Sequence, residues 1–122
     1  MDKVKIFSSI RDLLGRYSPP MVVKSETEIQ YELWSVKDVV IAGKKKNELF
    51  FASAIIQKSY VGFYFMPIYT DPELSEVISP MLLKTLKGKS CFHIKEISEQ
   101  VMKDIDLALK VGFDKYREKG WV

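Results

Sequence analysis

Two extended apolar runs, separated by only three residues, constrain the fold of this chain most strongly. They span Leu49 to Ile56 and Tyr60 to Met66, and the short connection Gln57-Lys58-Ser59 makes them an antiparallel hairpin. Because both runs are apolar on both faces, we expect them to form central strands of a sheet. Gly62, inside the second run, predicts a bulge or the close approach of another backbone.

The chain before this hairpin predicts one helix and then shorter strands. Asp2 is placed to cap the helix, and apolar side chains recur at helical spacing as far as Tyr17. The residue before a proline is pushed away from helical geometry, so Pro19-Pro20 ends the helix. The apolar period then falls to two, which predicts strands through residues 29–34 and 39–41.

The chain after the hairpin predicts short helical turns, one more strand and a long helix. The turns are expected after Asp71 and Ser79, because a proline follows each of them and suits the first helical position. Gly88 is expected to close the second turn. Residues 90–94 then form a strand, and residues 98–119 form a helix with a serine cap and one apolar face. The fold class is therefore α+β.

Length and composition are those of one soluble globular domain, residues 1–122. Hydrophobic residues make up 47% of the chain and charged residues 29%. The longest apolar run is far shorter than the ~20 residues that span a bilayer, so no membrane partner is expected. The N-terminus lacks the uninterrupted apolar core of a signal peptide. A single cysteine excludes an intrachain disulfide and indicates a reducing compartment, so we expect a cytoplasmic location.

The charge balance is only mildly basic, with a net charge of +3. This balance argues against nucleic acid as a partner unless the positive charges gather in space. The run from Lys44 to Lys46 is interpreted as a solvated hairpin loop, with a phosphate-binding role as the alternative. The candidates for an anion site are Lys44, Lys45, Lys46, Lys84, Lys87 and Lys89.

The local motifs do not predict a catalytic or metal site. Gly88-Lys89-Ser90 resembles the end of a phosphate loop, but the glycine required five residues earlier is Leu83. Cys91 and His93 share one face of a strand, yet two ligands are too few for zinc. We interpret them as a small buried thiol beside a partly exposed imidazole. The helical carboxylates, including Asp104, are expected to be solvated.

Aromatic residues concentrate between Phe50 and Tyr69, where most of them are expected to form the core of the sheet. The remainder could line a small-molecule pocket, because such pockets combine aromatic walls with a few polar groups. The candidates for that pocket are Tyr31, Trp34, Phe63, Phe65, Tyr69, Cys91 and His93.

The chain resembles the YdhG-like family of uncharacterised bacterial domains over nearly its whole length. The residues that carry the resemblance are the run from Tyr60 to Pro67, Pro80-Met81-Leu82, Gly88-Lys89-Ser90-Cys91-Phe92, Gly112-Phe113 and Tyr116. That family is grouped by fold with the YjbR-like and frataxin-like domains. The resemblance implies two layers, with a curved antiparallel sheet of about five strands under the N-terminal and C-terminal helices. It implies no catalytic residues.

The frataxin analogy also implies iron handling through an acidic ridge on the first helix and the edge strand. This chain departs from that pattern, because basic side chains outnumber acidic ones on its first helix, and such a helix repels a hard cation. The residues concerned are Asp2 and Asp12 against Lys3, Lys5, Arg11 and Arg16.

Three functions therefore remain open. The first is a non-enzymatic binding module that holds a small ligand or a protein partner in an aromatic-lined pocket between the sheet and the helices. The second is frataxin-like metal handling, and the third is anion or nucleic-acid binding through clustered lysines. No cofactor and no enzymatic activity are expected, because no nucleophile is paired with a base and an orienting group. Exposed aromatic edges are also typical of a homodimer interface.

Overall fold

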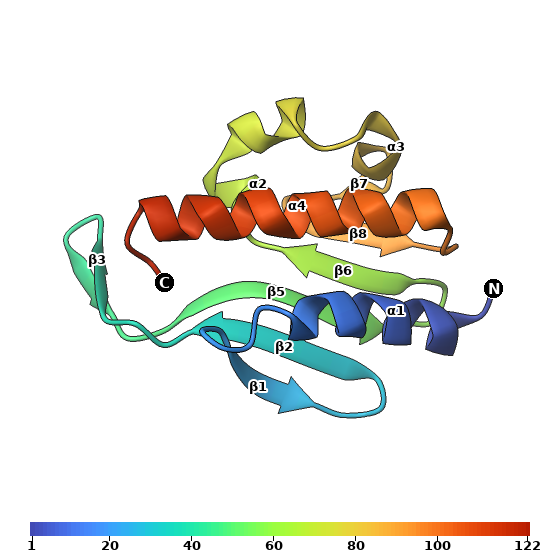
Figure 1. Ribbon diagram of the computed structural model, residues 1–122, viewed down its shortest axis with the longest axis horizontal. Coiled ribbons are helices and arrows are strands. Elements are labelled where there is room, and N and C mark those ends of the chain that lie inside the picture. Colours follow the sequence, from blue (N-terminus) through green and yellow to red (C-terminus); the bar gives the residue numbers. More distant parts are fainter.

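The computed structural model describes residues 1–122 and contains one large antiparallel sheet with helices on one of its faces (Figure 1). In chain order the elements are α1 (Lys3–Gly15), β1 (Val22–Glu26), β2 (Gln30–Ser35), β3 (Val39–Ile41), β4 (Lys44–Lys46), β5 (Leu49–Ile56), β6 (Val61–Phe65), α2 (Pro67–Thr70), the 3₁₀ helix η1 (Pro72–Glu76), α3 (Pro80–Leu83), β7 (Leu86–Lys87), β8 (Cys91–Ile94) and α4 (Glu99–Glu118).

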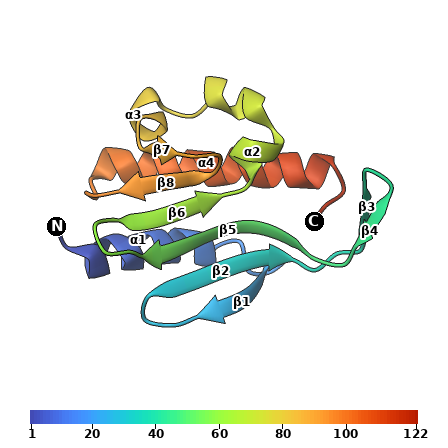
Figure 2. The same cartoon turned by 180° about the vertical axis from the view of Figure 1, so that it is seen from behind.

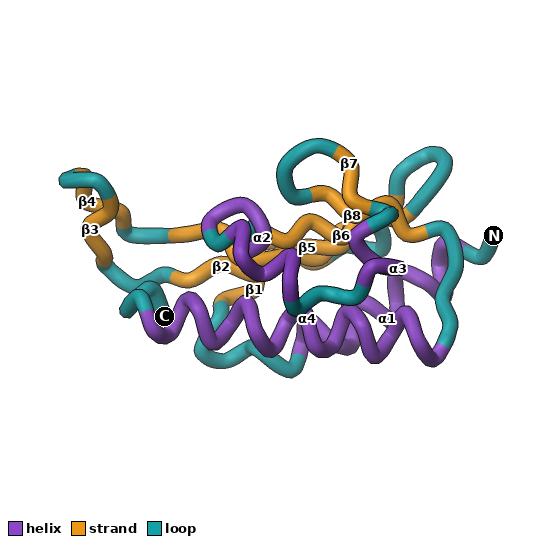
Figure 3. The backbone as a smooth tube through the Cα atoms, turned by 90° about the horizontal axis from the view of Figure 1, so that it is seen from above, coloured by secondary structure: helices purple, strands orange, loops and turns teal.

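The large sheet has six strands in the order β1-β2-β5-β6-β8-β7, and every neighbouring pair is antiparallel. Figure 3 shows the strands on one side of the molecule and the long helices α1 and α4 on the other. The predicted α+β class is confirmed, with β5 and β6 at the centre as expected. The sheet has six strands rather than about five because β1 and β7, which were not expected, form its two edges, whereas the expected strand β3 leaves it to pair with β4.

Strands β3 and β4 form a separate two-stranded hairpin that projects from one end of the molecule (Figures 1 and 2). The three lysines of β4 were expected to lie in a loop, but they pair with β3, Lys44 opposite Ile41 and Lys46 opposite Val39. Their side chains are exposed, as a solvated hairpin requires. None of the helices in the fold combines the length and the apolar character that a transmembrane span needs.

The predicted serine and aspartate caps begin the helices. The Asp2 carboxylate accepts a hydrogen bond from the Lys5 amide at 3.0 Å, and the Ser98 hydroxyl accepts one from the Val101 amide at 3.2 Å. The expected stop at Gly88 is wrong: α3 ends at Leu83, and Gly88, with φ of 68°, forms the turn between β7 and β8. Because the chain turns back at Gly88, the residues before it pair with β8 as the edge strand β7 instead of extending α3.

The core lies between the sheet and the two long helices, where 24 buried hydrophobic residues form one cluster. The two aromatic residues Phe50 and Phe51 separate at a β-bulge, since Leu33 pairs with Ala52 but the next residue pairs with Phe50. Phe51 is fully buried and meets the Tyr116 ring edge-on at a centroid distance of 5.3 Å. The bulge thus turns Phe51 toward the helices and leaves Phe50 on the opposite face.

Candidate functional site

The face of the large sheet that points away from α1 and α4 has no helix over it. In Figure 2 the strands β2, β5, β6 and β8 lie in front of the helices, and no other element crosses them. An uncovered face of an antiparallel sheet is usually polar. Here it carries aromatic side chains that are half-buried among polar ones. We call this surface the open face, defined by Lys24, Gln30, Glu32, Trp34, Phe50, Tyr60, Tyr64, Cys91 and His93.

At the β2 end of the open face, Trp34 is held by its neighbours. Its indole nitrogen donates a hydrogen bond to Glu32 at 2.7 Å, and the same carboxylate accepts one from Gln30 at 2.7 Å. The Lys24 ammonium lies 4.8 Å from the centre of the Trp34 ring, and Phe50 meets that ring edge-on at 5.4 Å. The indole is therefore fixed in position rather than free to change rotamer.

At the centre of the open face, Tyr64 lies over Gly62. A Cβ atom at Gly62 would come within 2.6 Å of the Tyr64 ring, so only glycine leaves room for that ring. The sequence predicted a bulge or a close backbone approach, but the close neighbour is a side chain two residues along the same strand. The Tyr64 hydroxyl accepts a hydrogen bond from the Gln57 side-chain amide at 3.0 Å. The glycine and the glutamine together position the phenol.

At the β8 end, the imidazole of His93 stacks on the Tyr60 ring with a centroid distance of 3.7 Å and an angle of 8° between the planes. Burial lowers the pKa of His93, and the ammonium groups of Lys87 and Lys95 lower it further. The imidazole is thus neutral at pH 7. At this end of the open face, the positive charge therefore comes from Lys87 and Lys95, and His93 contributes an uncharged flat ring.

Cys91 lies on the same face as His93, as the spacing predicts, but it is half-buried rather than buried, opposite Tyr64 of the neighbouring strand. Burial raises the pKa of the Cys91 thiol, and the neighbouring Tyr64 hydroxyl only partly offsets that rise. A thiol with a raised pKa is protonated at neutral pH and is a poor nucleophile. The pair therefore lacks the activated thiolate that cysteine catalysis requires.

The pocket expected between the sheet and the helices is filled by side chains. Tyr31, Phe63 and Phe65 point to the helix side and belong to the core, with Phe63 and Phe65 fully buried and their rings stacked at 5.5 Å. Trp34, Cys91 and His93 lie on the open face instead. Tyr69 is exposed on α2, where the Lys89 ammonium lies 5.2 Å from its ring. The seven candidates thus divide between two faces and a helix, because the alternation along each strand separates them.

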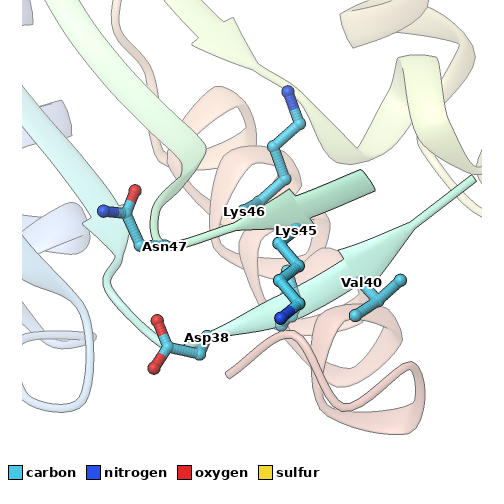
Figure 4. A pocket seen from close by; sticks show the side chains of 6 residues that line it. Asp38, Val40, Lys45, Lys46 and Asn47 are labelled. Atoms are coloured by element: carbon cyan, nitrogen blue, oxygen red, sulfur yellow. The ribbon is translucent and has the colours of Figure 1, made fainter. Parts of the chain in front are cut away.

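The six lysines considered for an anion site also divide. Figures 1 and 3 place the β3–β4 hairpin at one end of the molecule, apart from β7. The hairpin does border an open hollow of about 660 Å³, which Lys45, Lys46, Asp38 and Asn47 line with two valines. However, Lys45 and Lys46 leave β4 in opposite directions (Figure 4). A single anion in this hollow would meet only one of these two ammonium groups.

The fold does not assemble a metal-binding site, because no three His, Cys, Asp or Glu side chains lie close enough together to hold an ion. On α1, the Asp12 carboxylate forms an ion pair with Arg11 at 3.4 Å and does not lie beside another acid.

No family model, curated protein or solved structure matches this chain.

Sequence reasoning missed the open face because it assigned the central aromatic residues to one core. The signal was the alternation itself: in β6, Val61, Phe63 and Phe65 are buried, whereas Tyr64 is half-buried on the other face. A tyrosine between two phenylalanines predicts that the two faces of a strand meet different surroundings. The bulge at Phe51, which moves Phe50 to the open face, had no comparable signal in the sequence.

Proposed function

We propose that this protein is a non-enzymatic binding module that docks a partner protein on the open face of its sheet. The observation that carries the proposal is a set of aromatic side chains held in place on a face with no helix over it. Trp34, Tyr60 and Tyr64 each have a hydrogen-bonding or stacking neighbour in the protein. Rigid Tyr and Trp side chains are the residues that dominate protein–protein interfaces.

Fixed side chains favour binding because their ordering is completed before the partner arrives. Immobilising a side chain at an interface costs about 0.5–1.5 kcal/mol, and the internal contacts of the open face reduce that cost. The surface is also better suited to a protein than to a small molecule, since small ligands bind in concave sites. Neither of the two main hollows of the molecule is lined by Trp34, Tyr60 or Tyr64.

The charges around the open face specify the chemistry of the partner. Glu32 lies beside Trp34 at the β2 end, whereas Lys87 and Lys95 flank His93 at the β8 end. We therefore expect a partner surface that is apolar at its centre, acidic where it meets the two lysines and able to donate hydrogen bonds toward Glu32.

Nucleic acid fits this surface less well than protein does. Bases stack on the free faces of aromatic rings. Here the Trp34 ring is contacted by Lys24, and the Tyr60 and His93 rings cover one another. The resemblance to the YdhG-like family supports a binding role, since it implies no catalytic residues, and a reducing compartment such as the cytoplasm suits the free cysteine.

Affinity capture with matched variants tests the proposal. Tyr60→Glu places a charge in the open face, and Leu107→Glu makes the same kind of change at an exposed apolar residue of α4, on the helix side. The wild type and Leu107→Glu should retain the same protein from a lysate of cells that make this chain, and Tyr60→Glu should not. The purified partner should then shift the amide resonances of β2, β5, β6 and β8.

Three results would contradict the proposal. The first is equal retention by both variants together with amide shifts confined to the helices. The second is retention that disappears after nuclease treatment, which would make nucleic acid the ligand. The third is a dimer of this chain that is lost in Tyr60→Glu and for which no other protein competes, since a second copy would then occupy the face. Sedimentation at several concentrations detects that dimer.

A further inference from the structure

On the helix side of the sheet, Asp104 is a buried carboxylate with an oxygen that has no partner. The residue is only 8% exposed, although the sequence pattern predicted a solvated helix face. Its Oδ1 atom accepts a hydrogen bond from the Gln100 side-chain amide at 2.8 Å, but Oδ2 makes none. No other buried side-chain oxygen or nitrogen in the chain lacks a hydrogen bond. Such an oxygen requires an explanation, because an unsatisfied buried polar group costs about 1–3 kcal/mol.

Asp104 lines a small hollow at the junction of α3, β8 and α4. The hollow has a volume of about 70 Å³, roughly the volume that two water molecules occupy in liquid water. Met81, Leu82 and Val101 form apolar parts of its wall, and Glu96 adds a second carboxylate. The space therefore combines negative charge with walls that suit a short hydrocarbon group.

The protein supplies no cation to Asp104 in this arrangement. Lys95 lines the same hollow but makes no hydrogen bond to the free oxygen of Asp104. The other buried acid of the chain differs, since Asp71 accepts a hydrogen bond from the Lys119 ammonium at 2.8 Å. The Thr85 hydroxyl, which also lines the hollow, donates to the Leu82 carbonyl at 2.7 Å and so does not donate to the carboxylate.

We infer that this hollow binds the ammonium end of a short primary amine. An ammonium group supplies three hydrogen-bond donors and the positive charge that a buried carboxylate requires, and one or two methylene groups fill the remaining space against the apolar walls. Because Oδ2 has almost no accessible surface, the carboxylate turns about its Cβ–Cγ bond on binding to present this oxygen to the hollow. The amine is either a free alkylamine or the side-chain end of a lysine from another protein. The site is separate from the open face and does not depend on the proposed function.

The test is an NMR titration of the full chain with ethylammonium chloride at constant ionic strength. Ethylammonium has three non-hydrogen atoms, so a dissociation constant no tighter than the millimolar range is expected. The amides of Thr85 and Val101 should shift in a saturable manner. Tetramethylammonium carries the same charge but has no N–H donor and is bulkier, so it should produce no saturable shift.

Two variants and one control assign the shift to the carboxylate. Asp104→Asn keeps the shape of the side chain and should weaken ethylammonium binding at least tenfold. Asp114→Asn, which makes the same charge change at an exposed position of α4, should not. Met81→Trp, at a residue that is 55% exposed at the hollow, leaves Asp104 intact and should also prevent binding. This last variant keeps the test decisive if Asp104→Asn does not fold.

A second titration distinguishes the two sources of the amine. Nα-acetyl-lysine amide should produce the same shifts as ethylammonium if the hollow accepts the side chain of a lysine, and none if only free amines fit. The inference is overturned if ethylammonium produces no saturable shift, because the hollow then holds only water. It is also overturned if Asp104→Asn binds as tightly as the wild type. Binding seen only after Lys95→Met would show that the protein's own lysine occupies the site, which also overturns it.

Discussion

Replacing Gly112 by alanine should destabilise this protein, although the same change normally stabilises a helix. Gly112 lies within α4, facing the end of β6 and the start of α2, and a Cβ atom there would come within 2.4 Å of the Phe65 ring and 2.9 Å of Pro67. Carbon atoms in contact prefer about 3.5–4.0 Å, so the overlap with the ring exceeds ~1 Å. Phe65 cannot yield easily, because it is fully buried against Phe63 and Phe51.

The expected magnitude follows from two opposing effects. Alanine gains about 1 kcal/mol over glycine in a helix interior, whereas overpacking a tight core costs about 1–3 kcal/mol. Because the clash is with a fully buried ring, we take the upper value and expect a net loss of about 2 kcal/mol. The entropy of unfolding of a chain of 122 residues makes this a fall in Tm of roughly 8 °C.

Urea unfolding of Gly112→Ala and of a matched control tests this expectation. In Gly15→Ala, the new Cβ atom would lie 3.6 Å from the Tyr31 hydroxyl, an ordinary contact, so this variant should equal or exceed the wild type in stability. Phe65→Leu removes the ring atoms that clash, so the combination Gly112→Ala and Phe65→Leu should lose less than the two changes separately. A Gly112→Ala protein as stable as the wild type, or strict additivity in the double variant, would refute the reasoning.

Three further predictions concern polar groups that the fold buries wholly or in part. Tyr116→Phe removes the hydrogen bond that the hydroxyl donates to the Phe50 carbonyl at 2.5 Å and should cost about 1 kcal/mol at pH 7 in urea unfolding. Burial, together with the Asp71 carboxylate, raises the pKa of Tyr116, so the unfolded chain releases this proton near pH 10 before the folded one does. The stability that the buried Tyr116 hydroxyl contributes is therefore fully present below pH 10 and is lost progressively as the pH rises above 10. The wild type should accordingly lose more stability than Tyr116→Phe between pH 10 and pH 11. Lys119→Met leaves the buried Asp71 carboxylate without its ammonium partner and should cost about 2 kcal/mol, below the ~3–5 kcal/mol of a fully buried pair because the Lys119 side chain is 30% exposed. No change in the urea midpoint would contradict this. Because burial raises the pKa of Cys91, iodoacetamide at pH 8 should alkylate it at least tenfold more slowly in the folded protein than in urea, and equal rates would contradict the assignment.

Much of the fold follows from local patterns in the sequence. The apolar hairpin of β5 and β6, the caps at Asp2 and Ser98 and the apolar face of α4 all depend on residues close together in the chain, and each is found where it was expected. Features set by distant residues were missed. Strand β7 exists because residues after α3 pair along β8, and the bulge at Phe51 arises from a shift of register against β2.

The candidate site was harder to predict than the fold, for a related reason. Composition indicates that aromatic residues gather, but only the sheet decides which face each one occupies. Phe65 and Tyr64 are neighbours in sequence, yet the first lies in the core and the second on the open face. The burial of Asp104 could not be predicted for the same reason, because it depends on α3 packing against α4 and not on the charge pattern of its own helix.

The central claim, that the open face docks a partner protein, is tested most directly by site-specific photo-crosslinking in cells that make this chain. A photoreactive phenylalanine analogue at position 60, in place of Tyr60, should give one discrete adduct with another protein, and the Trp34→Ser change should remove that adduct. The same analogue in place of Leu107, on the exposed side of α4, should give none. Adducts formed from position 107 and not from position 60, or an adduct that Trp34→Ser leaves unchanged, would contradict the account.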